Sequence, residues 1–430
     1  MDSNIFGDKF IIEGQNRLSG EVRLKGFKNN SIKLIPAAIL IDGEVTLRDV
    51  PDLLDVSIAL EIFRELGGNA SFDKESGICK LDGRNINSFE INSDHSKRFR
   101  GSVSFLGPLY ARFGQARATF PGGDKIGVRD INTHFQVFES LGAEIVEEGE
   151  GQFLIKGNIT NYDFMLEQPS VTASENAIMS SIFSKGTVRL FNVACEPHVR
   201  ELCVFLNKAG AKISGVGSNL LTIQGVEKLN PIDYTLCSDP LDAGLFIIAA
   251  AITNGNIKIS NVNLYDLNPI LTQFKKLGVN IIIHDENTIE VPDNLELKVN
   301  NSYWGGIYSQ PWPLFPSDLM SPTITLATQC EGHILFFEKL YEARMNFTSQ
   351  LISMGADIFV ADPHRVIVNG KTQLYGSQVS SLDVRAGVAV LLAALCAKGQ
   401  SEVIGIKHID RGFDHIETTL NSLGAKIRRV

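Results

Sequence analysis

A short signal, in which an apolar residue is followed by glycine and then a small or apolar residue, recurs six times along this 430-residue chain. Its glycines are spaced by 75, 68, 68, 77 and 69 residues, at Gly67, Gly142, Gly210, Gly278, Gly355 and Gly424. Helical apolar spacing such as Ile416/Leu420/Leu423 precedes each glycine, and an alternating stretch such as residues 143–146 follows it. Each copy therefore predicts a helix that ends at a left-handed glycine and turns directly into a strand.

Each signal belongs to a larger repeating unit. Around Gly424, helical patterns at 383–398 and 413–423 alternate with strand patterns at 401–406 and 425–430. The same order recurs around Gly278, with helices at 241–252 and 267–277 and strands at 255–260, 280–284 and 288–291. A period of about 70 residues exceeds the roughly 20–50 residues of small solenoid repeats, so the units have to share a core. We expect an α/β chain of six βαβαββ units, in which helices cover sheets.

Composition limits the number of domains and the kinds of partner. With 430 residues and 44% hydrophobic residues, the chain is expected to form two domains of three units each. A net charge of −9 argues against bulk binding to nucleic acid or to an anionic membrane. The start of the chain does not have the layout of a signal peptide, and the apolar run at 386–397 is too short to span a bilayer. We therefore expect a cytoplasmic protein. Its six cysteines lack metal-ligand spacing, which favours free thiols and no metal site.

A first candidate site lies at residues 26–30, between a predicted strand and an apolar helix. Lys28 and Asn29 place cationic and amide donors beside the free backbone N–H groups of a helix start, where anions bind. The alternative is an ordinary N-cap by Asn29 or Asn30 with Lys28 in solvent.

A second candidate site is the stretch 121–129, with three glycines and three charged residues in nine positions. Such a stretch does not pack as a core element, and it is typical of a loop that closes over an anionic ligand, although a plain hairpin turn is equally compatible. Arg100, Arg112 and Arg117 precede it, so this part of the chain is rich in guanidinium groups.

A third group of candidates lies in the second half of the chain, where each member is placed at a loop-to-helix junction. The segments are Pro316–Asp318, Tyr341–Arg344, Leu382–Ala386 and His408–Gly412. Singly, Asp318 and Asp383 are most simply N-caps, and the arginines are solvated or paired with acidic neighbours. Jointly, arginines at equivalent positions of successive units can converge on one small polyanion, because each guanidinium offers a bidentate fork.

These segments resemble the enolpyruvyl transferases over essentially the whole chain. The matching stretches are Gly26-x-Lys28-Asn29, Arg100 with Leu106–Gly114, Pro121-Gly122-Gly123, Glu196-Pro197, Phe315-Pro316-x-Asp318 and His408–Gly412. Within the family the chain is most similar to the branch that acts on UDP-N-acetylglucosamine. The branch that acts on shikimate 3-phosphate carries Ser or Thr after the lysine, where this chain has Asn29.

The resemblance implies a two-domain inside-out α/β barrel of six βαβαββ repeats, three per domain. One domain would hold residues 29–238, including a catalytic loop at 121–129. The other would hold residues 1–28 plus 239–430, and the active site would lie in the interdomain cleft. A monomer or weak homo-oligomer is expected.

By resemblance, the chain is a transferase that moves the enolpyruvyl group of phosphoenolpyruvate to the 3-hydroxyl of UDP-N-acetylglucosamine with release of phosphate, in peptidoglycan precursor synthesis. Lys28 and Asp318 would be catalytic, with Asp318 taking the proton of the acceptor hydroxyl. Lys28, Arg129 and Arg411 would hold the phosphate, and Arg344 and Arg385 the carboxylate, of phosphoenolpyruvate. The further substrate contacts implied are Asn29, Arg100, His134, Ser170, Val171, Leu340 and Asp383. No metal and no cofactor is implied.

Three departures from the family pattern bear on the chemistry or on the acceptor. Asp124 stands where most members carry a catalytic cysteine, and a carboxylic acid can make the same proton transfer to the methylene carbon. A carboxylate is a far poorer nucleophile toward an epoxide than a thiolate, so the protein is expected to be insensitive to fosfomycin. Gln168 replaces a lysine that usually precedes Ser170–Thr172, and Ser104 replaces a usual Trp.

The loss of that lysine leaves the acceptor open. One alternative is an enolpyruvyl transferase that acts on a uridine nucleotide in nucleoside-antibiotic biosynthesis. Another is a non-catalytic paralogue that binds a nucleotide sugar. The joint presence of Lys28, Asp318, Arg344, Arg385 and Arg411 argues against the paralogue, since a binding module needs neither a base nor a full clamp for phosphoenolpyruvate.

Overall fold

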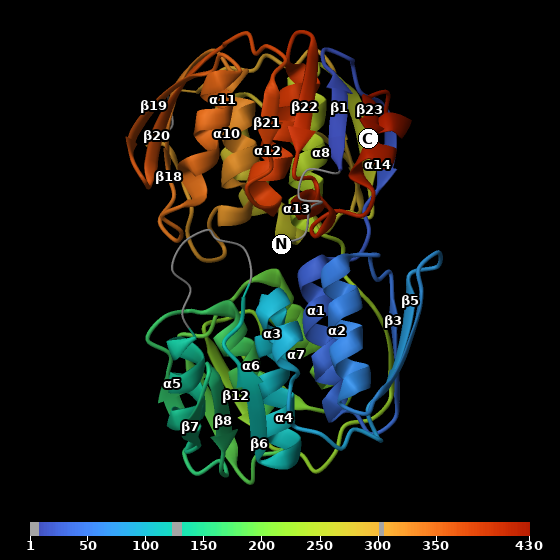
Figure 1. Ribbon diagram of the computed structural model, residues 1–430, viewed down its shortest axis with the longest axis vertical. Helices are drawn as coiled ribbons and strands as arrows, with labels where there is room; N and C mark the ends of the chain where they lie inside the picture. Colours follow the sequence, from blue (N-terminus) through green and yellow to red (C-terminus); the bar gives the residue numbers. More distant parts are fainter. Residues whose placement is uncertain (1–7, 123–130, 301–304) are drawn as a thin grey trace. The chain divides into compact units, whose positions relative to one another are not determined.

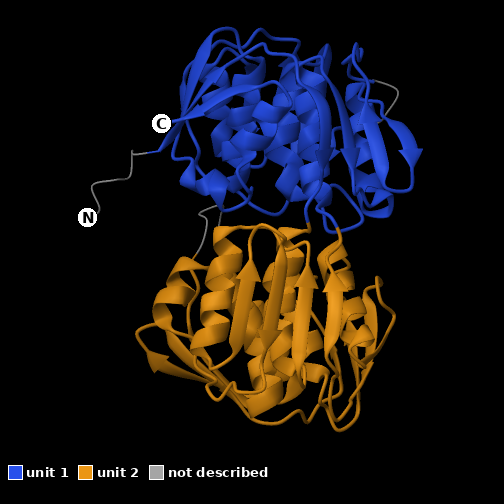
Figure 2. Ribbon diagram, turned by 90° about the vertical axis from the view of Figure 1, so that its right-hand side faces the viewer, with its two compact units in different colours: residues 1–25, 124–128, 238–430 blue, residues 26–123, 129–237 orange. Residues whose placement is uncertain are grey.

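The computed structural model describes residues 8–122, 131–300 and 305–430. The described residues form two compact units, shown in different colours in Figure 2. The first-half unit comprises those within 26–123 and 129–237, and the second-half unit those within 1–25 and 238–430. Among the described residues, no helix combines the length and the apolar character needed to cross a bilayer.

The first-half unit contains three sheets and the helices between them. Its strand orders are β13-β3-β5-β4, β6-β8-β7 and β11-β12-β10-β9. The strands are β3 (Glu44–Arg48), β4 (Asn69–Asp73), β5 (Ile78–Asp82), β6 (Gln115–Thr119), β7 (Glu144–Gly149), β8 (Gln152–Lys156), β9 (Asp163–Met165), β10 (Thr187–Phe191), β11 (Lys212–Ser214), β12 (Leu220–Gln224) and β13 (Ile232–Thr235). The helices are α1 (Lys28–Ala37), η1 (Ala38–Leu40), α2 (Leu54–Glu65), α3 (Ser93–Arg98), η2 (Arg100–Phe105), α4 (Leu106–Phe113), α5 (Asn132–Leu141), α6 (Val171–Ser181) and α7 (Pro197–Lys208).

The second-half unit repeats this plan with the sheets β15-β16-β14-β2, β17-β18-β20-β19 and β21-β22-β1-β23. Its strands are β1 (Lys9–Glu13), β2 (Ser19–Arg23), β14 (Asn256–Ser260), β15 (Ile282–Asp285), β16 (Thr288–Val291), β17 (Ile307–Tyr308), β18 (Gly332–Phe337), β19 (Asp357–Asp362), β20 (Arg365–Gly370), β21 (Gln378–Ser380), β22 (Gln400–Ile404) and β23 (Lys426–Arg429). Its helices are α8 (Pro240–Ile252), α9 (Leu264–Phe274), η3 (Lys275–Leu277), η4 (Ser317–Leu319), α10 (Met320–Thr328), η5 (Arg344–Phe347), α11 (Thr348–Ser353), α12 (Val384–Cys396), α13 (Lys407–Asp410) and α14 (Ile416–Ser422).

Helices lie inside and sheets outside because of where the apolar residues fall. Every residue of α10 is buried, as is every residue of α8 except Asp242 and of α12 except Arg385. A helix that is apolar on all sides has to lie in the interior, and Figure 1 shows α8, α10 and α12 in the middle of their unit. Strands such as β14 and β10 instead alternate between more and less buried residues, as expected for a sheet with one solvent face. The predicted inside-out α/β architecture is confirmed.

The glycine signal behaves as the sequence predicts. All six glycines have a positive φ, between 79° at Gly278 and 110° at Gly210. Each follows a helix and precedes a strand of its unit, as Gly424 does between α14 and β23. These backbone conformations disfavour any residue with a Cβ atom, which explains why the signal recurs with glycine in all six copies.

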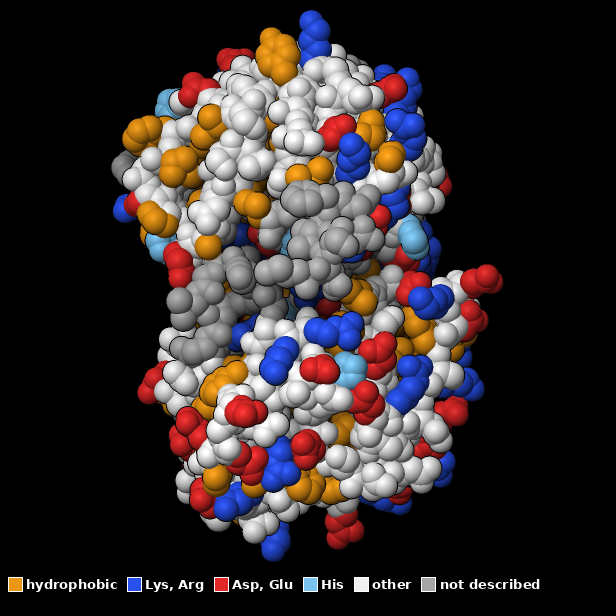
Figure 3. Space-filling view, viewed as in Figure 1, with side chains coloured by type: hydrophobic (Ala, Val, Ile, Leu, Met, Phe, Trp, Pro, Cys, Tyr) orange, Lys and Arg blue, Asp and Glu red, His pale blue; other side chains and the backbone are white. Residues whose placement is uncertain are grey.

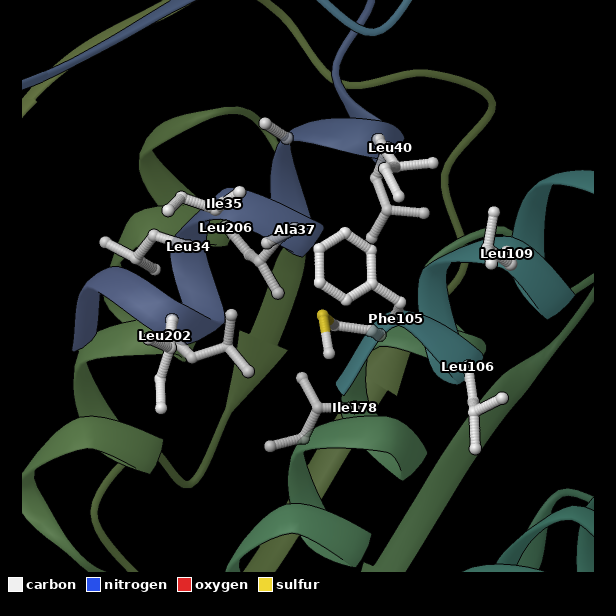
Figure 4. Close-up of a cluster of buried hydrophobic side chains, with 14 of the residues drawn as sticks. Leu34, Ile35, Ala37, Leu40, Phe105, Leu106, Leu109, Ile178, Leu202 and Leu206 are labelled. Atoms are coloured by element: carbon white, nitrogen blue, oxygen red, sulfur yellow. The ribbon is translucent and has the colours of Figure 1, made fainter. Parts of the chain in front are cut away.

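The core of the first-half unit is formed where α1, α4, α6 and α7 meet. Figure 4 shows side chains from all four helices in one cluster, with the Phe105 ring among Ala37, Leu40 and Ile178. Phe105, Leu106, Ile178 and Leu206 have almost no exposed surface. Residues that lie at the N-terminal ends of α1, α4 and α6 are thereby held by a packed interior.

The chain changes unit between residues 25 and 26 and again between 237 and 238. Strand β2 pairs in parallel with β14 in the second-half unit, and β13 pairs in parallel with β3 in the first-half unit. Each pair joins two strands that are distant in sequence. In the first-half unit, the Phe27 N–H donates to the Cys237 carbonyl at 2.8 Å. Lys28 therefore begins α1 and belongs to the first-half unit, whereas the boundary expected at 28/29 assigned it to the other domain.

Candidate functional site

The second-half unit brings three predicted site residues together at helix starts. Asp318 lies in η4, Arg344 begins η5, and Arg385 lies in the first turn of α12. Asp318 Oδ1 lies 3.2 Å from Arg344 Nη2, and Asp318 Oδ2 lies 3.1 Å from Arg385 Nη2. The Asp318 side chain is 34% exposed, whereas those of Arg344 and Arg385 are 2% and 13% exposed. One accessible carboxylate is thus held between two largely buried guanidinium groups, and we name these three residues the Asp318 cluster.

Acidic groups near the Asp318 cluster stabilise the charged form of Arg385. Asp239 caps α8, and its carboxylate accepts from the Leu241 N–H at 2.8 Å. Burial would lower the pKa of Arg385, but the carboxylates of Asp318, Asp239 and Asp242 raise it above the ordinary value. Burial raises the pKa of Asp239 to about 6, with Arg385 opposing the shift. These charged side chains therefore interact with one another at the N-terminal ends of α8, α10 and α12, where the helix dipoles are positive.

A buried carboxylate outside the predicted set positions Asp318. Glu338 has no exposed surface. Its Oε2 accepts from the Ser317 hydroxyl at 2.7 Å, next to Asp318, and its Oε1 accepts from the Ser309 hydroxyl at 2.7 Å. The N–H groups of Leu340 and Tyr341 also donate to Oε1, at 2.8 and 3.2 Å. Glu338 thus ties η4 to the segment that leads to Arg344.

Other predicted residues of this unit lie nearby with distinct roles. Asp383 caps α12 and accepts from the N–H groups of Arg385 and Ala386 at 2.8 and 3.1 Å, so its side chain orients the start of that helix. Arg411 directly follows α13, and the ring of Phe413 lies 5.7 Å from the Arg385 guanidinium. Leu340 is 44% exposed. The α13 segment therefore packs beside the Asp318 cluster.

In the first-half unit, Lys28 and Asn29 form the start of α1. Lys28 Nζ lies 2.7 Å from Asp55 Oδ2, and the two side chains are 15% and 6% exposed. Phe27, which has no capping side chain, occupies the N-cap position of α1. The alternative of an Asn cap with Lys28 in solvent is therefore wrong.

His134 lies in a buried polar network beside the start of α6. Its side chain approaches Thr172 Oγ1 through Nε2 at 3.0 Å and Asn176 Nδ2 through Nδ1 at 2.9 Å. Because an amide nitrogen only donates, we assign the neutral tautomer with the proton on Nε2. Burial, with the charges of Arg100 and Lys33, lowers the pKa of His134 to about 3. Its buried ring therefore orients the first turn of α6 through Thr172 and Asn176.

The α4–α6 contact explains one motif of the sequence. The Gly107 N–H donates to Asn176 Oδ1 at 2.8 Å, and a Cβ atom on Gly107 would lie 2.8 Å from the Asn176 carbonyl oxygen. Gly107 is thus required by close helix packing.

Arg112 and Arg117 serve structure as well. Arg112 donates to backbone carbonyls, and Arg117 pairs with Glu90 and Glu148.

A buried ion pair lies deeper in the same unit. Lys33 Nζ lies 2.8 Å from Glu175 Oε2 and donates to Ser104 Oγ at 2.9 Å. The Lys33 and Glu175 side chains are 4% and 0% exposed. Sequence patterns gave no indication of this pair, because the two residues are distant in sequence and lie in different helices, α1 and α6. Asp124 and Arg129 lie outside the described residues.

The chain belongs to the family described as EPSP synthase (3-phosphoshikimate 1-carboxyvinyltransferase), whose model matches residues 12–420. Curated relatives named UDP-N-acetylglucosamine 1-carboxyvinyltransferase are similar over nearly their full length. That of Treponema denticola is 42% identical over 97% of this chain and 98% of its own. That of Bacteroides thetaiotaomicron is 39% identical over 98% and 99%.

Solved structures share the fold at lower identity. The enolpyruvyl transferase NikO from Streptomyces tendae has a TM-score of 0.89 at 24% identity and covers 98% of this chain and 99% of its own. An EPSP synthase from Acinetobacter baumannii has a TM-score of 0.75 at 18% identity and covers 98% and 100%. At these identities the likeness shows the fold alone.

Proposed function

We propose that the protein transfers the enolpyruvyl group of phosphoenolpyruvate to the 3-hydroxyl of UDP-N-acetylglucosamine, releasing phosphate, as a step of peptidoglycan precursor synthesis. The observation that carries the proposal is the accessible Asp318 carboxylate between two largely buried arginines. Family membership and relatives about 40% identical that carry that name support it.

Arg344 and Arg385 bind the carboxylate of phosphoenolpyruvate in this proposal. Both side chains have little exposed surface. In such an environment a guanidinium group, which can donate two hydrogen bonds to one carboxylate, binds it more strongly than in water. Lys28, Arg129 and Arg411 take the phosphate, and Arg100, Asn29, Ser170, Val171 and Leu340 contact substrate. The proposal thus requires both units to serve one reaction.

Asp318 accepts the proton of the acceptor hydroxyl. Its two arginine partners stabilise its anionic form and so make it a weak base. A substrate carboxylate that binds the same guanidinium groups competes with Asp318 for them. Binding of phosphoenolpyruvate would therefore strengthen Asp318 as a base. Asp124 donates a proton to the methylene carbon, and the acceptor oxygen bonds to the adjacent carbon to form a tetrahedral adduct. As that adduct expels phosphate, the carboxylate left on Asp124 takes back a proton from the methyl group, which restores the double bond of the enol ether.

The nucleoside-antibiotic alternative is supported by the likeness to NikO, which is a likeness of fold. Identities near 40% to the UDP-N-acetylglucosamine enzymes favour the peptidoglycan acceptor. The non-catalytic alternative gives no reason for an accessible carboxylate between the two arginines of the Asp318 cluster.

Phosphate release from phosphoenolpyruvate, measured with UDP-N-acetylglucosamine, with uridine monophosphate and without acceptor, tests the proposal. We expect release only with an acceptor, and faster with the UDP-sugar. Faster release with uridine monophosphate would overturn the peptidoglycan assignment. Because position 124 is Asp, preincubation with fosfomycin is expected to leave the rate unchanged, and Asp124→Cys to become sensitive.

A further inference from the structure

The buried Lys33–Glu175 pair joins three central helices of the first-half unit. Lys33 comes from α1, Glu175 from α6, and the Ser104 hydroxyl that accepts from Lys33 comes from η2, which leads into α4. These are the helices whose N-terminal ends carry Lys28, Arg100 and Ser170 with Val171. The pair therefore lies directly behind the segments to which substrate contacts are proposed.

Stability alone is a poor explanation for this pair. Taking two charges out of water costs more than their attraction returns unless further hydrogen bonds complete the site. Among the described residues, Glu175 Oε1 is buried and has no hydrogen-bond partner. Apolar residues of similar size often replace such a pair with little loss of stability. We therefore expect the pair to have a role that depends on its two charges.

The two charges lie close enough to act on an anion at the start of α6. Glu175 follows Val171 by four residues, which is a rise of about 6 Å along the helix. The charge of Lys33 reaches His134, whose ring bonds to Thr172 in the first turn of α6. Interactions over such distances inside a protein are screened little by salt.

Several groups around Glu175 set its protonation. Lys33 and Ser104 lie on one side, and Glu196 and Cys203 of the α7 region also face it. His134 is neutral, and Arg100 lies near His134. Burial raises the pKa of Glu175 to about 7, Lys33 opposes that shift, and Glu196 adds to it. Glu175 therefore exchanges a proton near neutral pH.

We propose that Lys33 is a positioning residue for the anionic nucleotide tail of the acceptor, and that Glu175 takes up a proton from solvent when that tail binds. An anion at the start of α6 raises the free energy of the ionised Glu175 carboxylate relative to its protonated form, so Glu175 binds a proton. The positive charge of Lys33 is then no longer neutralised and attracts the anion. This supplies positive charge where Gln168 does not. The identity of the anion as a nucleotide diphosphate rests on the proposed function.

Titration calorimetry of the intact protein with UDP-N-acetylglucosamine tests the proposal. The diphosphate of this ligand keeps its charge near neutral pH, so any proton taken up belongs to the protein. In buffers of different ionisation enthalpy at about pH 7, we expect uptake of about half a proton per ligand bound. Affinity is expected to fall about three- to tenfold between about pH 6 and about pH 8.5.

Two variants separate this role from folding. Glu175→Gln is expected to abolish the proton uptake and most of the pH dependence. Lys33→Met/Glu175→Met replaces the pair by apolar side chains and is expected to fold, to bind about tenfold more weakly and to take up no proton. The surface pair Lys80–Glu44, at 3.3 Å in the same unit, provides the control Lys80→Met/Glu44→Met, in which uptake and affinity are retained.

The possible outcomes distinguish this inference from the proposed function. Binding with native uptake in the Lys33→Met/Glu175→Met protein, or no uptake in the native protein, overturns the inference. If the native protein releases phosphate with the nucleotide sugar but takes up no proton on binding it, the inference is rejected and the proposed function stands. Binding with uptake that Glu175→Gln abolishes, but without turnover, supports the inference and rejects the proposed function. Failure of the native protein to bind the nucleotide sugar overturns both.

Discussion

Each unit contains a group of largely buried charges, and the Asp318 cluster and the Lys33–Glu175 pair differ in access to solvent. In the Asp318 cluster the carboxylate is 34% exposed and can exchange partners with a ligand. In the Lys33–Glu175 pair both side chains are almost fully enclosed, so a ligand can act on them only through its field. In the proposed roles, similar ion pairs serve different ends, and the exposure of the acidic partner decides which.

Breaking the enclosed pair is expected to have the largest effect on folding. Lys33→Met leaves Glu175 buried without its counterion, which costs about 3–5 kcal/mol of unfolding free energy. Lys33→Met/Glu175→Met should recover most of that loss. Denaturant unfolding measures both, with Lys80→Met, a lysine whose side chain is 53% exposed, as control. A loss below about 1 kcal/mol in Lys33→Met would show that the pair is not enclosed as described.

Removing one arginine of the open cluster should affect activity more than folding. Arg385→Ala deletes a proposed partner of the substrate carboxylate and is expected to lower kcat/KM about 10²- to 10³-fold. Arg365→Ala removes an arginine paired with Asp362 at 2.6 Å whose side chain is 53% exposed, and it should leave kcat/KM unchanged. Equal effects of the two substitutions would remove Arg385 from the site.

The enclosed carboxylate also predicts how stability depends on pH. The pKa of Glu175 is raised to about 7 from an ordinary value of 4.5, so the folded state binds more protons between these values. Its contribution is fully present below about pH 4.5 and is lost as pH rises through about 7, by at most about 3 kcal/mol. Comparison of native and Glu175→Gln unfolding at several pH values isolates this slope. A native slope unchanged in the variant would contradict the assignment.

The smallest expected effect concerns the support of the open cluster. Glu338→Gln replaces one acceptor oxygen by a donor in a site where four groups donate, and we expect a loss of about 1–2 kcal/mol in unfolding free energy. Because Ser317 adjoins Asp318, kcat/KM should fall as well. Glu331→Gln, at a side chain that is 69% exposed, is the matched control. If both variants behaved alike, Glu338 would have no positioning role.

The sequence predicted the α/β repeat well because the signals that define the repeat lie within short stretches of the chain. Six glycines at helix ends define the repeat, and the all-apolar stretches of α8 and α12 mark the interior helices. The arginines at helix starts indicated a common anion site, whereas the place of Asp318 in the same site followed from the family resemblance. Lys33 and Glu175 could not be predicted, because a charged residue in an apolar helix has no local signature of its partner. Glu338 and Asp239 were missed because their roles depend on contacts between distant segments.

The most direct test of the account is acceptor-dependent phosphate release by Asp318→Asn, compared with the native protein and with Asp362→Asn. An amide at position 318 retains the shape but cannot accept the proton, so the rate is expected to fall about 10²- to 10⁴-fold. Asp362 pairs with Arg365, whose side chain is 53% exposed, at the turn between β19 and β20, and it should tolerate the change. A native rate in Asp318→Asn would contradict the assignment of the open cluster as the catalytic site.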